Sequence, residues 1–216
     1  RARIVKIAAQ LFAQRGYHAV GMSDIQDAVK LGRGALYHHI RSKEDLLYDV
    51  TREYITELAD SALRLKAEER DPVARLTRLG SVLVHKVASH QAELTVCFRD
   101  VQSLSTERCN EVMGWHGRYE QVWRDTMIEG AEQGVFRPFD AVVLKGVLGM
   151  YYYCYLWMKP QRPEGAQAIA ERFNDLTLRM LRATWSCMRS CACSAALLAM
   201  AGGGGACSSS HSATLS

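Results

Sequence analysis

The sequence lacks the long hydrophobic run that a membrane-spanning helix needs. Its most apolar stretch, residues 142–158, is interrupted by Lys145 and by three consecutive tyrosines. That stretch is also shorter than the roughly 20 apolar residues that cross a bilayer. Alternating apolar and polar runs bounded by turn residues, which would predict β-strands, are missing too. These absences exclude a membrane partner and favour an all-α fold.

Recognisable catalytic motifs are missing as well. We find no glycine-rich phosphate loop, no metal-spaced ligand pair and no nucleophile elbow. His38 and His39 are neighbours, and neighbouring residues on a helix point about 100° apart, so the pair is poorly placed to hold one metal ion. His85, His90 and His116 stand singly. We predict no enzymatic activity, no metal and no cofactor, and an enzyme remains one alternative.

Cysteine is unevenly distributed. Cys97, Cys109 and Cys154 lie in segments of helical periodicity, where they resemble small apolar residues. This usage is typical of reduced intracellular proteins, so we predict a cytoplasmic location. The other four cysteines fall in residues 186–216, which also contain a run of four glycines.

Residues 186–216 have a composition that cannot bury a core, and we expect a low-complexity flexible tail. An alternative is a metal site built from Cys187, Cys191, Cys193 and His211, although their spacing fits no zinc pattern.

Positive charge is concentrated at the start of a chain whose net charge is only +4. Residues 1–43 contain eight Lys or Arg and only two acidic residues, Asp24 and Asp27. Such a cluster predicts contact with phosphates. The alternative is an ordinary solvated helix surface.

Two short helical segments follow each other in this basic region. Ser23 and Gln26 have the spacing of a capping box, which predicts a helix that begins at Asp24. Leu31-Gly32 should end it, because glycine tolerates the left-handed backbone of a tight stop. A second helix is then expected over residues 33–40.

Leu36 and Ile40 are spaced to anchor this second helix on the first. Its other faces carry Arg33, Tyr37, His38 and His39. These side chains suit phosphate and base-edge contacts in a major groove, the role of the second helix of a helix-turn-helix.

The order of these motifs resembles the amino-terminal domain of TetR-family transcriptional regulators. The resemblance covers residues 11–17, 22–25, 34–40 and 42–47. Ile40 stands where the family usually has Phe, at a position expected to be core. The resemblance implies that phosphates are contacted by Ser23, Tyr37, His39 and Lys43. It also implies that Arg33, Gly34 and His38 lie nearest the bases.

Beyond residue 42 the periodicity is helical almost throughout. We expect helices that begin at Ser42 and Asp71-Pro72, a long one over 107–132 stopped by Gly134, and two more over 141–158 and 164–183. The predicted architecture is a three-helix helix-turn-helix domain over residues 1–47, a larger helical ligand-binding and dimerisation domain over 48–185, and the tail. About nine helices are expected in total.

The segment 142–158 has almost no polar face, so it must be covered on several sides. TetR-family proteins pair through their last two long helices as a four-helix bundle. We therefore expect a homodimer formed through residues 141–158 and 164–183, which reads an inverted-repeat operator in double-stranded DNA with grooves about 34 Å apart. The alternative is a monomer with an unusually buried central helix.

Aromatic residues in the body are candidates for the wall of an apolar ligand cavity. They are Phe98, Trp115, Tyr119, Trp123, Met127, Tyr152, Tyr155 and Trp157. Trp115, Tyr119 and Trp123 share one helix face. Arg99, Arg118, Arg124 and Arg162 are candidates to meet an anionic group at the cavity mouth. The alternative for each residue is ordinary core packing or a solvated surface position.

Residues 129–138 and Trp157 are similar to TetR-family members that sense fatty-acyl or steroid-derived CoA thioesters. The predicted function is a ligand-responsive transcriptional regulator, a repressor that binds a palindromic operator as a homodimer and is released by a small apolar or acyl-CoA inducer. A helical DNA-binding protein with no small-molecule ligand is the second alternative, beside the enzyme.

Overall fold

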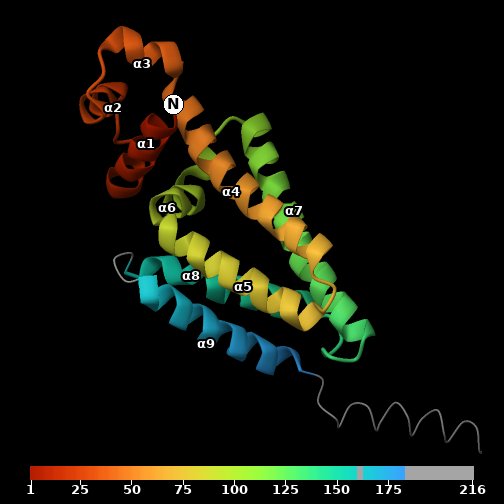
Figure 1. The fold of residues 1–216 in the computed structure, drawn as a ribbon. Coiled ribbons are helices and arrows are strands. Elements are labelled where there is room, and N and C mark those ends of the chain that lie inside the picture. Colours follow the sequence, from red (N-terminus) through yellow and green to blue (C-terminus); the bar gives the residue numbers. More distant parts are fainter. Residues whose placement is uncertain (160–162, 183–216) are drawn as a thin grey trace, which may run out of the picture. The chain divides into compact units, whose positions relative to one another are not determined.

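The computed structural model describes residues 1–159 and 163–182, except for the side chains of Arg33, Pro163 and Glu164. These residues form nine α-helices and two short 3₁₀ helices, with no β-strand among them, which confirms the all-α prediction (Figure 1). In chain order they are α1 (Ala2–Arg15), α2 (Met22–Val29), α3 (Arg33–His39), α4 (Lys43–Glu68), α5 (Pro72–Ser89), α6 (Gln91–Asp100), η1 (Val101–Ser103), α7 (Thr106–Glu132), α8 (Ala141–Tyr153), η2 (Cys154–Leu156) and α9 (Pro163–Leu181). The predicted tail and Arg162 lie outside the described residues.

The first three helices, here called the head, share one small core. Helix α1 buries Ile4, Val5, Ala8 and Phe12, which recur at helical spacing. It ends where Gly16, at φ +87°, turns the chain and donates its N–H to the carbonyl of Phe12 at 2.8 Å. Because few residue types adopt this φ without strain, the glycine fixes where α1 stops.

The start of α2 differs from the prediction. The helix begins at Met22, and Asp24 rather than Ser23 makes the capping contact: the N–H of Gly21 donates to Asp24 Oδ2 at 2.6 Å. A carboxylate is a stronger acceptor than a hydroxyl. That hydrogen bond and the guanidinium of Arg15 at 3.0 Å lower the pKa of Asp24. Ser23 is left exposed on the first turn of α2.

The end of α2 also differs. The helix stops at Val29, and Lys30 adopts the left-handed conformation, at φ 56°, that we expected of a glycine at Leu31-Gly32. Gly32 instead precedes α3 as its N-cap. Helix α3 begins at Arg33, as expected, and ends at His39 after about two turns.

Helices α4 to α9 form the body. Ser42 caps α4 by accepting the N–H of Asp45 at 3.0 Å, and Asp71 caps α5 through the N–H groups of Val73 and Ala74, as the sequence indicated. Helix α4 runs out of the head and packs along α7, while α5 packs against both α7 and α9 (Figure 1). Helix α1 lies against α4 and α6, so the head rests directly on the body.

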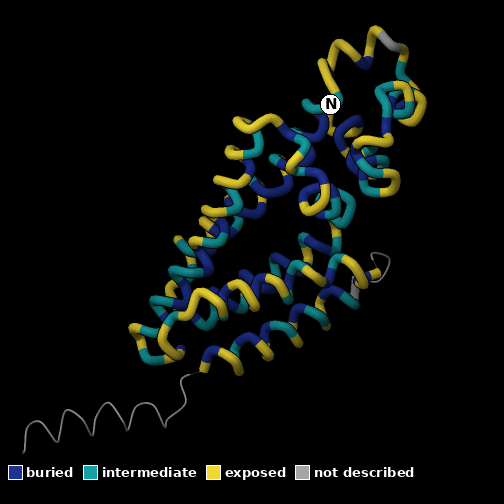
Figure 2. The backbone as a smooth tube through the Cα atoms, turned by 180° about the vertical axis from the view of Figure 1, so that it is seen from behind, coloured by how far each residue is buried: buried dark blue, intermediate teal, exposed yellow. Residues whose placement is uncertain are grey.

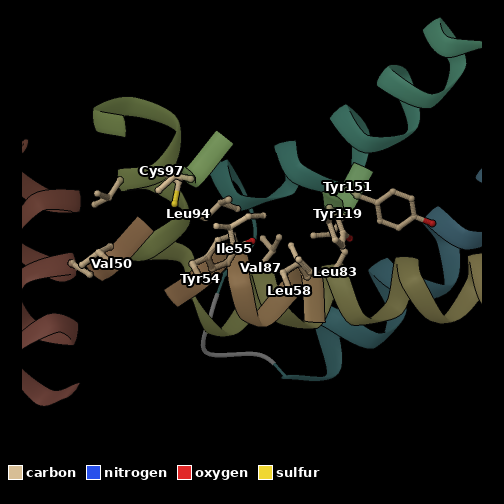
Figure 3. Packing of buried hydrophobic residues seen from close by; sticks show 14 of the residues in the cluster. Val50, Tyr54, Ile55, Leu58, Leu83, Val87, Leu94, Cys97, Tyr119 and Tyr151 are labelled. Carbon is tan, nitrogen blue, oxygen red and sulfur yellow. The ribbon is translucent and has the colours of Figure 1, made fainter. Parts of the chain in front are cut away.

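Buried side chains lie on the faces that the helices turn toward one another (Figure 2). Tyr54 and Leu58 from α4 meet Leu83 and Val87 from α5 in the centre of the body (Figure 3). Four apolar residues recur at helical spacing along α4 and are all buried, namely Leu47, Val50, Tyr54 and Leu58. This core holds α4 and α6, the two elements that carry the head.

A buried polar network ties α9 to α5 and α8. The hydroxyl of Tyr151 donates to Asn174 Oδ1 at 2.7 Å. The amide of Asn174 donates to the carbonyl of Thr77 at 3.1 Å and to Ser81 Oγ at 2.9 Å. Because every member has a partner, the network fixes the position of α9 without leaving a buried polar group unsatisfied.

Helix α8 is shorter than the predicted 141–158. Asp140 caps its start by accepting the N–H of Val142 at 2.7 Å, as expected, but the α-helix stops at Tyr153. The chain tightens into η2, in which the thiol of Cys154 donates to the carbonyl of Tyr151 at 2.9 Å. Within η2 the ring of Tyr155 stacks on Phe98 of α6.

Candidate nucleic-acid interface and ligand site

Helix α3 is held by two residues and exposes the rest of its described side chains. Leu36 and Ile40 are each 1% exposed and pack into the head core, which confirms their predicted anchoring role. Gly34, Tyr37, His38 and His39 are exposed, and the two histidine rings meet edge to face with centroids 5.2 Å apart. The helix therefore presents a polar, aromatic surface, with hydrogen-bond donors and acceptors, to whatever approaches the head.

Gly34 leaves open space on this surface. A Cβ atom built at Gly34 would meet no atom within 4 Å, and the same is true of Gly32. The fold of the chain therefore does not require glycine at either position. A glycine on an exposed helix face allows another molecule to approach the backbone closely.

Lys43 occupies a different position from the one we expected of a phosphate contact. Its ammonium donates to the carbonyls of Tyr17 at 3.1 Å and Val20 at 3.0 Å, and it lies 4.4 Å from the centre of the Tyr17 ring. An ammonium has three N–H donors, and two of them are engaged in holding the loop between α1 and α2. Lys43 thus fixes the geometry of the helix-turn-helix from within.

An open hollow of about 360 Å³ lies beside α3, and it adds residues that the sequence did not single out. Its lining comprises Arg1, Tyr37, His38, His39, Ile40, Arg41 and Asp45. Arg41 is exposed at the end of α3, and Arg1 pairs with Asp49 at 2.6 Å. Both arginines belong to the basic region, but only folding brings Arg1 next to residues 37–41.

A second hollow, of about 480 Å³, lies between α6 and η2. Thr95, Phe98, Arg99, Tyr155 and Leu156 line it, so three of the predicted ligand residues meet there. The ring of Phe98 stacks on that of Tyr155, with centroids 5.5 Å apart and planes 17° apart.

Aromatic rings continue from this hollow into the body. Phe98 contacts Tyr152 edge to face at 5.7 Å, Tyr152 meets Tyr119 at 6.4 Å, and Tyr119 meets Trp123 at 6.3 Å. The path begins at a ring that is 54% exposed and ends at an indole that is fully buried. The structure thus joins five of the eight predicted ligand residues in one continuous aromatic series.

Buried polar atoms on this path, and one at the neighbouring Tyr54, have no hydrogen bond of ordinary geometry within the described residues. They are the hydroxyls of Tyr54, Tyr119 and Tyr152 and the indole N–H of Trp123. Burial raises the pKa of the three hydroxyls, and the Trp123 indole partly opposes this rise at Tyr119. The hydroxyls remain protonated donors. Unsatisfied buried donors are costly, and in native proteins they point to a water or a ligand.

The other three predicted wall residues lie outside this series. Trp157 is 51% exposed and meets the ring of Phe173 edge to face at 6.3 Å. Trp115 is half-buried, and the guanidinium of Arg118 lies 4.4 Å from its ring centre. Met127 is one of the buried residues of α7. Helical spacing placed Trp115 on the same face as Tyr119 and Trp123, but only the latter two join the aromatic path. Arg124 lies over the ring of Phe139 at 4.8 Å, away from the hollow's lining.

The last two α-helices, α8 and α9, each carry exposed apolar side chains. Val142 and Tyr153 on α8 are 78% and 64% exposed, and Leu176 and Met180 on α9 are 48% and 44% exposed. The glycines of α8, Gly146 and Gly149, have no atom within 4 Å of an added Cβ. Both helices therefore expose apolar side chains, and α8 also leaves open space at its two glycines.

Comparison with known proteins decides the family. Residues 4–50 match the family described as "Bacterial regulatory proteins, tetR family", and residues 69–181, more than half of the chain, match the "Tetracyclin repressor-like, C-terminal domain". The chain belongs to the TetR family of transcriptional regulators. The resemblance carried by the first fifty residues is thereby confirmed, and the body belongs to the same family.

Individual TetR-family relatives cover most of the chain. The transcriptional repressor KstR2 of Mycobacterium tuberculosis is 25% identical over 181 residues, which are 82% of this chain and 90% of the relative. PfmR from Thermus thermophilus is 31% identical, with a TM-score of 0.76 over 82% of this chain and 97% of PfmR. AibR, solved in complex with isovaleryl coenzyme A and operator DNA, is 25% identical, with a TM-score of 0.72 over 81% of this chain and 96% of AibR.

Among the described residues of this TetR-family chain, none of the helices has the length and apolar character needed to span a bilayer.

Burial of His116 on α7 makes us expect that the free energy of unfolding depends on pH. Burial lowers the pKa of His116 from 6.5 to about 4. The folded protein therefore keeps the imidazole neutral between pH 6.5 and 4, whereas the unfolded chain takes up a proton there. Stability is lost as the pH falls through this window, by about 2 kcal/mol at pH 5.

We expect His116→Gln to lack the part of the pH dependence of unfolding that comes from protonation of His116 in the unfolded chain. Urea unfolding at pH 7.5 and pH 5.0 should show a smaller fall in the free energy of unfolding for the variant than for the wild type. Identical falls would mean that the imidazole is solvated.

Proposed function

We propose that this protein is a ligand-responsive transcriptional repressor that acts in the cytoplasm and binds DNA through α3. The observation that carries the proposal is the division of α3 into two buried anchors, Leu36 and Ile40, and an exposed surface formed by Gly34, Tyr37, His38 and His39. A helix held in this way can enter a major groove without disturbing the head.

Within the head we propose the following roles. Ser23, Tyr37 and His39 contact backbone phosphates, while Arg33, Gly34 and His38 lie nearest the bases. Lys43 serves mainly to hold the loop at Tyr17 and Val20, with its third N–H directed to a phosphate. Arg41, exposed at the end of α3, adds a further phosphate contact.

We propose that the protein acts as a homodimer joined through α8 and α9. The exposed apolar residues Val142, Leu176 and Met180 support this assembly, as do Gly146 and Gly149, which allow a partner helix to approach. A two-fold axis would then place two copies of α3 in successive major grooves of an inverted repeat.

We propose a CoA thioester as the inducer. Three observations support an amphiphilic ligand: the hollow lined by Phe98 and Tyr155, the arginine at its edge, and the buried tyrosine hydroxyls further in. The acyl group would follow the aromatic path, the thioester carbonyl oxygen would accept a hydrogen bond from a tyrosine hydroxyl, and the phosphates of the CoA would remain near the surface. AibR, a structural neighbour, is described in complex with isovaleryl coenzyme A.

We propose no enzymatic activity. Burial raises the pKa of the thiols of Cys97 and Cys154, to about 11 for Cys154, so both stay protonated and are poor nucleophiles.

Selection of bound DNA from a random pool tests the central proposal. The expected product is a palindrome with half-sites centred about one helical turn apart or somewhat more. Recovery of sequences without two-fold symmetry would contradict the dimeric reading mode, and recovery of no enriched sequence would contradict the regulator's use of α3.

Substitutions on α3 should separate base reading from phosphate contact. We expect His38→Ala to relax preference at one or two base pairs, each change amounting to about 1–3 kcal/mol. Tyr37→Phe should weaken binding to all sequences by roughly fivefold, because it removes the proposed hydrogen bond to a phosphate and keeps the ring. His18→Ala, outside α3 and hydrogen-bonded to Ser103, is the matched control and should bind like wild type. Uniform loss for both α3 variants would contradict this division of roles.

A further inference from the structure

Arg99 connects the last turn of α6 with the last turn of α1. Its guanidinium donates to the backbone carbonyls of Phe12 and, at 3.2 Å, Ala13. It also pairs with Asp100 at 3.1 Å, and the Asp100 side chain is only 8% exposed. The carbonyl end of a helix attracts a cation, so these contacts fix α1 to α6. We call this set of contacts the Arg99 clip.

Phe98, the residue before Arg99, packs against the body. Phe98 stacks on Tyr155 and makes an edge contact with Tyr152, so it packs against η2 and α8. Two consecutive residues of α6 therefore reach the ligand hollow and the head. A movement of this turn that accommodates a ligand at Phe98 must also move the backbone that carries Arg99.

Arg99 itself borders the hollow, together with Thr95, Phe98 and Tyr155. Its side chain is 42% exposed, so solvent and solutes reach it. In the described structure two of its acceptors are neutral carbonyls. A phosphate group is charged and can accept two parallel hydrogen bonds from a guanidinium, so it adds a charge–charge attraction that a neutral carbonyl lacks.

We propose that the hollow beside Arg99 is the subsite for the anionic end of the ligand, and that its occupation draws Arg99 away from the carbonyls of Phe12 and Ala13. Release of the Arg99 clip frees the last turn of α1 from α6 and loosens the head. Ligand binding and DNA binding then oppose each other through one side chain. This inference rests on the proposed function, since it requires a ligand with a phosphate or an equivalent anion.

The first experiment uses the full chain without DNA and inorganic pyrophosphate as the probe. Pyrophosphate at millimolar concentration should shift the Nε–H NMR signal of Arg99, assigned by its absence in Arg99→Met, and should speed amide hydrogen exchange over residues 12–16. An unchanged Arg99 signal and unchanged exchange would overturn the subsite.

The second experiment measures coupling with palmitoyl-CoA and the selected DNA. The quantity is the ratio of thioester affinities without and with bound DNA, and typical allosteric ratios are about 5 to 150. Arg99→Met should lower this ratio at least threefold, and Arg99→Lys should restore part of it. Arg78→Met removes an arginine of similar exposure that pairs with Glu68 and Glu69 on the body, and it should leave the ratio unchanged.

The outcomes separate the two proposals. If Arg99→Met shows the same ratio of thioester affinities as wild type, the Arg99 clip does not couple ligand binding to DNA binding. The thioester then remains the inducer. If palmitoyl-CoA has no effect on wild type but pyrophosphate releases the clip, the ligand class is wrong and the anionic subsite stands. If neither probe acts, both proposals are wrong.

Discussion

Replacing Gly80 with alanine should lower the free energy of unfolding by about 3 kcal/mol. A Cβ atom at Gly80 of α5 would overlap Asn174 Oδ1 and lie 2.5 Å from the hydroxyl oxygen of Tyr151. Neither atom can retreat cheaply, because each belongs to the buried network that joins α5, α8 and α9. The added methyl group must therefore break hydrogen bonds that have no solvent to replace them.

Gly117→Ala is the matched control, since Gly117 lies on the exposed side of α7 with no atom within 4 Å of an added Cβ. Alanine is favoured over glycine in a helix by about 1 kcal/mol, so this variant should be slightly more stable than wild type. Urea unfolding of both variants gives the comparison. Equal stability of the Gly80 variant and wild type would show that Tyr151 and Asn174 can move together and that the network does not fix α9.

Gly80→Ala should also weaken dimerisation. Asn174 lies two residues before Leu176, the apolar residue by which α9 is proposed to pair. If the network is displaced, the face of α9 rotates or shifts relative to α8. We therefore expect the folded fraction of Gly80→Ala to dimerise more weakly than wild type.

Local features of the fold were predictable from the sequence. Ser42, Asp71 and Asp140 begin helices as expected, because a cap depends on residues within three positions of it. The same logic failed at Ser23, where Asp24, one residue away, made the capping contact instead. Competition between two acceptors is decided by side-chain chemistry and by Arg15, which sequence spacing does not reveal.

Contacts between distant residues were not predictable. Lys43 binds carbonyls 23 and 26 residues earlier, and Arg99 binds carbonyls 86 and 87 residues earlier. Backbone carbonyls occur at every residue, so nothing in the sequence marks these as acceptors. Similarly, periodicity placed Trp115 on the face of Tyr119 and Trp123, but which neighbouring helix covers that face depends on tertiary packing.

Placing a charge on the apolar face of α9 should abolish dimerisation and with it most operator binding. Leu176 on α9 is 48% exposed and lies one helical turn before Met180, which is 44% exposed. Leu176→Arg leaves the monomer fold intact, because the side chain already reaches solvent. In a dimer interface it would bury an unpaired guanidinium, at a cost of several kcal/mol.

Loss of the dimer also separates the two heads. Each copy of α3 then binds a half-site independently, without the second contact that a linked pair makes at high effective concentration, and we expect operator affinity to fall by at least roughly 100-fold. Size-exclusion chromatography with light scattering and a gel-shift titration measure the two effects. Leu63→Arg on α4, at 45% exposure, is the matched control and should remain dimeric. A Leu176 variant that stays dimeric and binds operator normally would move the interface away from α9, and with it the geometry that pairs the reading helices.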